Sequence, residues 1–126
     1  MLSTLSLVAL GGAIGASLRW LTGVALLRAL GPTDFPLAIV AVNVIGSFLM
    51  GVFVVAAAHK GLTHLSPLVM TGLLGGFTTF SAFSLETMTL IERGQMASAG
   101  LYILLSVGLS VGALALGLVI ARGIFA

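Results

Sequence analysis

The chain alternates between long apolar segments and short polar stretches. Charged residues, proline and glycine gather in three places, GPTDFP (31–36), HKGLTHLSP (59–67) and ERGQ (92–95). Each apolar segment between them is long enough to cross a bilayer as a helix, which needs about 20 residues. The sequence therefore predicts an all-α membrane protein with four transmembrane helices in a single domain of 126 residues. The predicted spans cover residues 4–30, 36–58, 65–91 and 96–122.

The composition agrees with this prediction and excludes several classes of protein. Hydrophobic residues make up 60% of the chain and charged residues 6%, whereas a soluble domain has about 25% charged residues. The few Lys and Arg form no basic patch, so we expect no nucleic acid as partner. There is no cysteine, and His59 and His64 lack the further ligands that a metal site needs. We interpret the N-terminal segment as the first span and not as a signal peptide, because it lacks a basic start.

Positive charges are balanced between the two predicted sides of the membrane. Four spans place both termini on one side with Lys60 and Arg122, while Arg28 and Arg93 fall on the other side. Orientation normally follows an excess of Lys and Arg on one side, and here the two counts are equal. We therefore expect dual topology and an antiparallel homodimer with a two-fold axis in the membrane plane. The alternative is a single topology set by one loop charge or by the insertion machinery.

Small residues recur at the spacing that lets membrane helices approach closely. The pairs are Gly11/Gly15, Gly72/Gly76, Gly108/Gly112 and Ala113/Gly117. They predict a compact bundle or oligomer and indicate nothing about its activity.

The third apolar segment contains the stretch GGFTTFSAF, which is a poor helix former. Its glycine and hydroxyl residues predict that the third helix is broken at mid-membrane, around Gly75, Gly76, Thr78, Thr79 and Ser81. Non-helical backbone at membrane depth is tolerated only inside protein or beside a wet cavity. In an antiparallel dimer the break would meet its own copy, and facing carbonyls could hold a hard cation such as Na+. The alternative is that threonine hydroxyls and water satisfy the broken backbone.

Three hydroxyl side chains are predicted to lie on one face of the fourth span. Tyr102, Ser106 and Ser110 follow one another at intervals of four residues, so a helix places them in one stripe. Each can donate a hydrogen bond at a depth where polar groups are rare. The alternative for a serine alone is a hydrogen bond to the carbonyl four residues earlier, with no further role.

The second and third spans add groups of matching chemistry. Asn43 contributes two N–H donors, and Phe80 and Phe83 share one helix face with the positive edges of their rings. Glu86, in contrast, lies toward a helix end, so no carboxylate falls at mid-span. Donors and ring edges without a carboxylate favour a small anion over a cation. Taken singly, the phenylalanines could be packing residues and Asn43 a contact between helices.

These segments together resemble the Fluc/CrcB family of fluoride channels. The similarity covers the whole chain through GGAIGASLRW, VNVIGSFLMG, GGFTTFSAF and the stripe of the fourth span. It implies a dual-topology homodimer with two fluoride pathways in the bacterial cytoplasmic (inner) membrane. It also implies a channel, not an enzyme, that exports fluoride passively and protects the cell from fluoride toxicity.

The resemblance assigns roles to individual positions. Asn43, Phe80, Phe83, Tyr102, Ser106 and Ser110 match residues that line the fluoride pathway. Gly75 and Thr78 match positions whose backbone carbonyls hold a structural Na+ at the dimer centre. Arg19 matches an arginine that acts as a vestibule or structural charge. From the residues alone, Arg19 could instead pair with Glu86 or extend to the membrane surface.

Two positions depart from the family pattern, and two rival functions stay open. Ile39 replaces a frequent threonine near the pathway, and Ala82 replaces one near the break; both changes affect details of ion coordination. A proton-coupled drug exporter with four spans would need a carboxylate in the membrane, usually in the first span, which here has Arg19 and no acid. A membrane subunit without transport activity would use the glycine pairs for packing alone.

Overall fold

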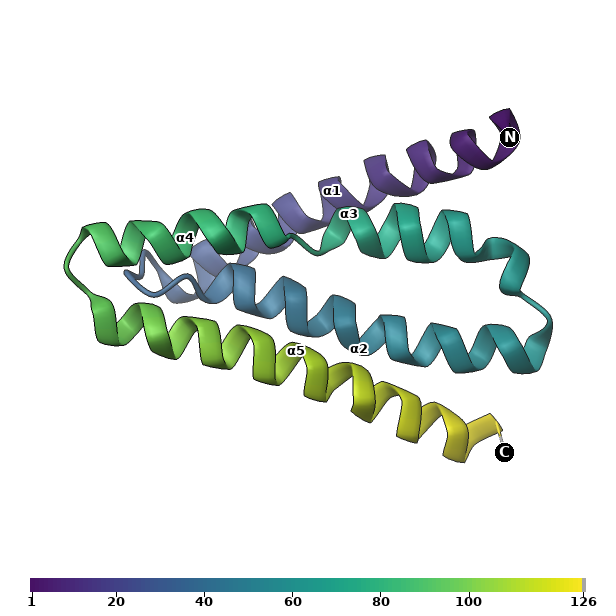
Figure 1. Cartoon of the computed structure of the whole chain (residues 1–126). Helices are drawn as coiled ribbons and strands as arrows, with labels where there is room; N and C mark the ends of the chain where they lie inside the picture. Colours follow the sequence, from purple (N-terminus) through teal and green to yellow (C-terminus); the bar gives the residue numbers. More distant parts are fainter. Residues whose placement is uncertain (126) are drawn as a thin grey trace.

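The computed structural model describes residues 1–125, and this part of the chain is helical without β-strands (Figure 1). Three of the spans are continuous helices, and the third span consists of four shorter segments. The continuous helices are α1 (Leu2–Leu30), α2 (Leu37–Lys60) and α5 (Met96–Phe125). The third span comprises η1 (Thr63–Leu65), η2 (Pro67–Leu74), α3 (Gly75–Phe77) and α4 (Phe80–Glu92).

The four spans have the length and the apolar character that a bilayer requires. They contain 24 to 30 residues and their most apolar windows have mean hydropathies from 1.4 to 2.5. A helix of this length extends about 36–45 Å, enough for a hydrocarbon core of about 30 Å. Large apolar side chains on their outer faces, such as those of Leu104 and Val119, are exposed as in a lipid-facing surface. The prediction of a multi-pass membrane protein with four helices is confirmed.

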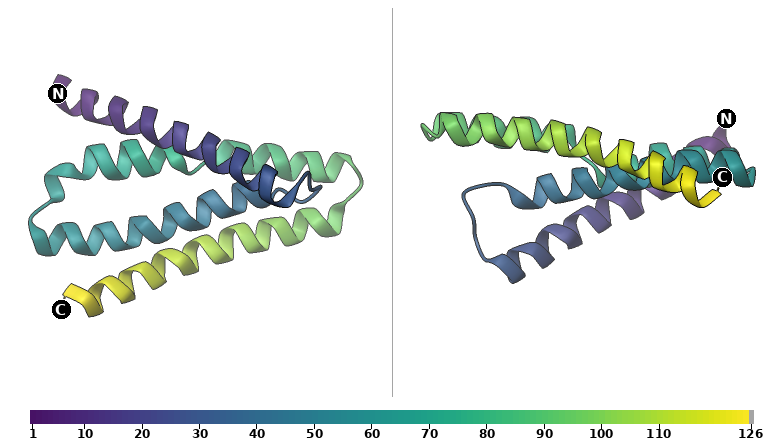
Figure 2. Two further views of the ribbon diagram at one scale, coloured as in Figure 1. Left: turned by 180° about the vertical axis from the view of Figure 1, so that it is seen from behind. Right: turned by 90° about the horizontal axis from the view of Figure 1, so that it is seen from below.

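Glycine contacts determine how the spans pack. Both termini lie at one end of the bundle, α5 runs along α2, and α1 crosses the third span (Figure 2). A Cβ atom at Gly11 or Gly15 would collide with the backbone around Leu73, and one at Gly117 would collide with the carbonyl of Phe48. These are the close approaches expected of small residues in membrane helices.

Not every predicted glycine pair is used within the chain. Gly72 and Gly76 face the backbone of α1, as their spacing predicts. Gly108 and Gly112, in contrast, have no atom of the described residues within 4 Å of an added Cβ, so they make no close helix contact here. Gly51 packs against the carbonyl of Leu114 and belongs to no predicted pair.

The third span is interrupted at two threonines. Thr78 (φ −83°, ψ 157°) and Thr79 (φ −150°, ψ 122°) are extended, whereas Gly75 (φ −64°, ψ −36°) is helical. Of the residues predicted to form the break, Gly75 and Gly76 therefore lie in α3, and Ser81 lies in the first turn of α4. The glycines remain helical because Gly76 packs closely on α1, where a side chain would overlap Gly12.

Hydrogen bonds hold both sides of this interruption. Before it, the backbone N–H and the hydroxyl of Thr78 donate to the carbonyl of Leu74 at 3.0 and 2.9 Å. After it, the Thr79 hydroxyl accepts a hydrogen bond of 3.1 Å from the backbone N–H of Ala82. Thr79 is thus the N-cap of α4, so the second threonine both ends the extended stretch and starts the next helix.

Candidate functional site

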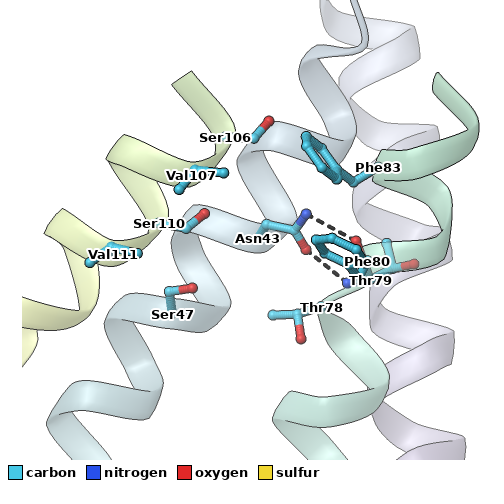
Figure 3. Close-up of a pocket in the computed structure, with 10 residues that line it drawn as sticks. All are labelled: Asn43, Ser47, Thr78, Thr79, Phe80, Phe83, Ser106, Val107, Ser110 and Val111. Carbon is cyan, nitrogen blue, oxygen red and sulfur yellow. Dashed lines mark hydrogen bonds between the residues drawn. The ribbon is translucent and has the colours of Figure 1, made fainter. Parts of the chain in front are cut away.

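A cavity of about 280 Å³ lies beside the interruption, between α2, α4 and α5. We call it the central cavity. Its polar groups come from α2, the break and α5, and the rings of α4 and two valines of α5 lie beside them (Figure 3). The lining residues are Asn43, Ser47, Thr78, Thr79, Phe80, Phe83, Ser106, Val107, Ser110 and Val111. The cavity brings together five of the six predicted pathway residues; Tyr102 lies next to it, against the ring of Phe83.

The amide of Asn43 closes the broken backbone. Its Nδ2 donates to the carbonyl of Thr79 at 3.1 Å, and its Oδ1 accepts from the N–H of Thr79 at 2.8 Å (Figure 3). Because a backbone N–H can only donate, this pairing fixes which end of the amide is oxygen. One N–H of Nδ2 is used by Thr79, so the second N–H is left for a ligand in the cavity.

α2 approaches the break closely because it carries glycine there. An added Cβ at Gly46 would overlap the methyl group of Thr78. Gly46 lies three residues after Asn43 on the same helix, so the missing side chain lets Asn43 reach Thr79. The spacing of this glycine was a usable signal in the sequence, although no prediction drew on it.

The hydroxyl stripe of α5 lies inside the bundle without hydrogen-bond partners. Tyr102 is 0% exposed and Ser106 5%. The hydroxyl oxygens of Tyr102, Ser106 and Ser110 are buried, and none of them pairs with any group of residues 1–125. A buried polar atom without a partner costs about 1–3 kcal/mol, so this stripe is costly unless a ligand or water completes it.

Several other hydroxyls of the bundle form a local hydrogen bond, which those of the stripe do not. Ser17, Thr22 and Thr87 each donate to the carbonyl four residues earlier, at 2.7 to 2.8 Å. That local bond is the usual fate of serine and threonine in a membrane helix. Ser106 and Ser110 do not form it, so the alternative of a purely local bond is wrong for both serines.

The two phenylalanines of α4 continue the stripe as a row of rings. The centroids of Phe80 and Phe83 are 5.3 Å apart, and those of Phe83 and Tyr102 are 5.2 Å apart. Phe83 is buried at 9% exposure, whereas Phe80 is 75% exposed at the edge of the cavity. The site is therefore covered on the side of Phe83 and uncovered on the side of Phe80.

The electrostatic character of the central cavity is neutral and rich in donors. No ionisable side chain is among the residues that line it. Its polar groups are an amide and hydroxyls, which can donate to an anion without a fixed countercharge. A site without a fixed positive charge can let a bound anion leave again, which conduction requires.

Arg19 lies on the far side of the break. Its Nε donates to the carbonyl of Gly76 at 3.1 Å, and the side chain lines a separate cavity of about 300 Å³ with Trp20 and Thr79. Over the described stretch of chain it forms no ion pair with Glu86, which lines a different cavity. The pairing of Arg19 with Glu86 is therefore not observed, because the carbonyl freed by the break takes the guanidinium instead.

The interruption frees further backbone carbonyls, since residues before a helix end lose their partners. The carbonyls of Gly76 and Thr79 accept from Arg19 and Asn43. Those of Gly75 and Thr78 accept from no donor within residues 1–125. Carbonyl oxygen suits a hard cation, whereas no group of three or more His, Cys, Asp or Glu converges in the described part. The unpaired carbonyls therefore fit the predicted Na+ by chemistry.

Three lining residues were outside the predicted site. Ser47 lies one helical turn after Asn43 on α2, and this spacing could have identified it. Val107 and Val111 follow Ser106 and Ser110 by one residue each and line the cavity with apolar surface. Nothing in their chemistry distinguishes them from other valines of the spans.

Comparison with known proteins assigns the chain to a family. Residues 6–118 match the family model described as CrcB-like protein, Camphor Resistance (CrcB). A protein of Ruegeria sp. (strain TM1040), named fluoride-specific ion channel FluC, is 69% identical over 98% of both chains. A protein of the same name from Roseobacter denitrificans is 66% identical over 98% of this chain and 99% of its own length. Another from Cereibacter sphaeroides is 58% identical over 98% of both chains. With a family match over most of its length and relatives this similar, the chain belongs to the CrcB family.

Proposed function

We propose that this protein is a fluoride-selective ion channel, as its relatives are named, and that it is not an enzyme. The observation that carries the proposal is the row of three buried hydroxyls without partners beside the free N–H of Asn43. Fluoride is a small and strong hydrogen-bond acceptor, and these groups are all donors. The channel releases fluoride from the cell down its gradient and so protects against fluoride toxicity.

In the proposed pathway a dehydrated fluoride is passed between donors. The second N–H of Asn43 and the hydroxyls of Ser110, Ser106 and Tyr102 bind it in turn. The edges of Phe80 and Phe83 carry positive potential and cover the ion where no hydroxyl reaches. Chloride is larger and a weaker acceptor, so it gains less from these donors and fits a narrow path less well.

The proposed channel is an antiparallel, dual-topology homodimer in the bacterial cytoplasmic membrane. The equal Lys and Arg counts on the two sides give the chain no preferred orientation. The exposed ring of Phe80 supports a partner at this edge of the central cavity, because a pathway open to lipid would not hold a dehydrated ion. The interruption at Thr78 and Thr79 then lies at mid-membrane, against its copy in the other subunit.

We further propose a structural Na+ at the centre of this dimer. The support is chemical: the carbonyls of Gly75 and Thr78 lack donors in the described chain, and Gly75 lies at the surface. These carbonyls would hold the ion, and a two-fold axis would double their number. Arg19 acts as a structural charge that occupies the neighbouring carbonyl of Gly76.

Efflux from liposomes tests the proposed function against its rivals. Purified protein is reconstituted into vesicles loaded with potassium fluoride or potassium chloride, and a potassium ionophore starts release. We expect fast fluoride release, negligible chloride release and no need for a pH gradient. Coupling to protons would instead favour the exporter, and no release from folded protein would favour a subunit without transport activity.

A further inference from the structure

Three aromatic rings form a partition at one end of the hydroxyl stripe. Tyr102 lies between Phe83, at a centroid distance of 5.2 Å, and Phe35, at 5.7 Å with the rings at 89°. Tyr102 is fully buried, and its hydroxyl has no partner within the described part of the chain. Phe35 comes from the loop between α1 and α2, so it belongs to none of the spans that build the pathway.

This partition lies between two cavities. Phe83 lines the central cavity, whereas Phe35 lines a second cavity of about 380 Å³, which we call the end cavity. The end cavity also includes Thr33, Ile39 and Glu86. Tyr102 lines neither cavity, and its ring contacts Phe83 of the central cavity and Phe35 of the end cavity.

The positions along the helices agree with this order. Ile39 of the end cavity precedes Asn43 of the central cavity by one turn of α2. Glu86 follows Phe83 by nearly one turn of α4, and Tyr102 precedes Ser106 by one turn of α5. All three steps lead toward the end of the bundle that holds the α1–α2 and α4–α5 loops (Figure 1). The end cavity therefore lies beyond Tyr102 in this direction.

Phe35 is held in place and does not simply fill a loose loop. Its carbonyl accepts hydrogen bonds from the hydroxyl of Thr33 at 2.7 Å and from the N–H of Leu37 at 2.8 Å. Pro36 follows it and keeps its backbone extended. Its ring packs on the buried cluster that contains Phe83, Leu90 and Tyr102.

We propose that Phe35 limits the rate of fluoride movement at the end of the pathway. Fluoride leaves the Tyr102 hydroxyl across the edge of the Phe35 ring and enters the end cavity, where it regains water. Glu86 in that cavity is a carboxylate and disfavours residence of an anion, so the end cavity works as an exit. This inference rests on the proposed function and adds a specific narrow point to it.

A series of ring sizes at position 35 tests this role in the full-length protein in liposomes. We expect fluoride efflux to increase by about threefold or more in Phe35→Ala, as a lower barrier at a rate-limiting step requires. Phe35→Leu should give a smaller increase, and Phe35→Trp a decrease. Phe53→Ala on α2 is the matched control, since Phe53 is half-buried and lines none of the three cavities; its efflux should stay at the wild-type rate.

The possible results are distinguishable. If efflux falls in both the Ala and the Trp variants and their unfolding temperatures are lower than that of the wild type, Phe35 has a packing role and the inference is overturned. Equal efflux across the series would also overturn it. If the Ala variant does not fold, the efflux rates of the other proteins still test the inference, which requires Phe35→Leu to be faster than the wild type and Phe35→Trp to be slower. Wild-type protein without fluoride efflux would refute the proposed function itself, and the inference with it.

Discussion

The side-chain amide of Asn43 forms two hydrogen bonds with the backbone of Thr79, at 3.1 Å from Nδ2 to the carbonyl and at 2.8 Å from the N–H to Oδ1. One side chain of α2 thereby replaces the helical partners that the third span loses at its interruption. The same amide keeps a donor for the central cavity. Backbone support and the proposed ion binding are therefore joined in one residue.

Asn43→Asp removes both N–H donors of this side chain and adds a negative charge. The carboxylate can still accept from the Thr79 N–H but cannot donate to its carbonyl, and its charge repels an anion. We expect fluoride efflux to fall by about tenfold or more, as the loss of a hydrogen bond worth about 1–3 kcal/mol and added repulsion imply. Efflux from liposomes measures this. An Asp variant that conducts like the wild type would place the pathway away from Asn43.

Gly15→Ala should destabilise the contact between α1 and the third span. The added methyl group overlaps the backbone of Leu73, and such overpacking costs about 1–3 kcal/mol. The unfolding temperature in detergent reports the loss. Gly12→Ala is the matched control, because no neighbouring atom of residues 1–125 outside its own helical turn lies within 4 Å of its Cβ position and alanine favours the helix. Equal unfolding temperatures for the two variants would contradict the packing described here.

Thr79→Ala should loosen the start of α4. It removes the hydroxyl that accepts from the Ala82 N–H, a loss of about 1 kcal/mol for an N-cap. Hydrogen exchange at the Ala82 amide should become faster than in the wild type. Thr79→Ser keeps the hydroxyl and should exchange slowly; fast exchange in both variants would mean that the cap has no part in holding α4.

The spans and the stripe were predictable because they depend on local patterns. Charges and prolines mark the helix ends, and the intervals between Tyr102, Ser106 and Ser110 alone place them on one face of α5. The exact place of the interruption was not predictable in the same way. Gly75 and Gly76 are poor helix formers in isolation, yet both lie in α3, where Gly76 packs against α1. The break falls instead at the threonines that Asn43 and the cap support.

The partners of Arg19 and Phe35 depend on the tertiary structure and have no signal in the local sequence. Arg19 binds the Gly76 carbonyl, which becomes available only because the helix ends there. Phe35 reads as part of a turn, and only the fold brings its ring to Tyr102. The spacing of residues along one helix does not reveal contacts that a side chain makes with another element.

The most direct test of the central claim removes the hydroxyls of the stripe. Fluoride efflux is measured for the double variant Ser106→Ala and Ser110→Ala, beside Ser17→Ala, whose hydroxyl donates to the Ala13 carbonyl on α1. If the unpaired hydroxyls carry fluoride, the double variant should lose about tenfold or more of the rate, since each donor is worth about 1 kcal/mol, while Ser17→Ala keeps it. A folded double variant that releases fluoride at the wild-type rate would contradict the account.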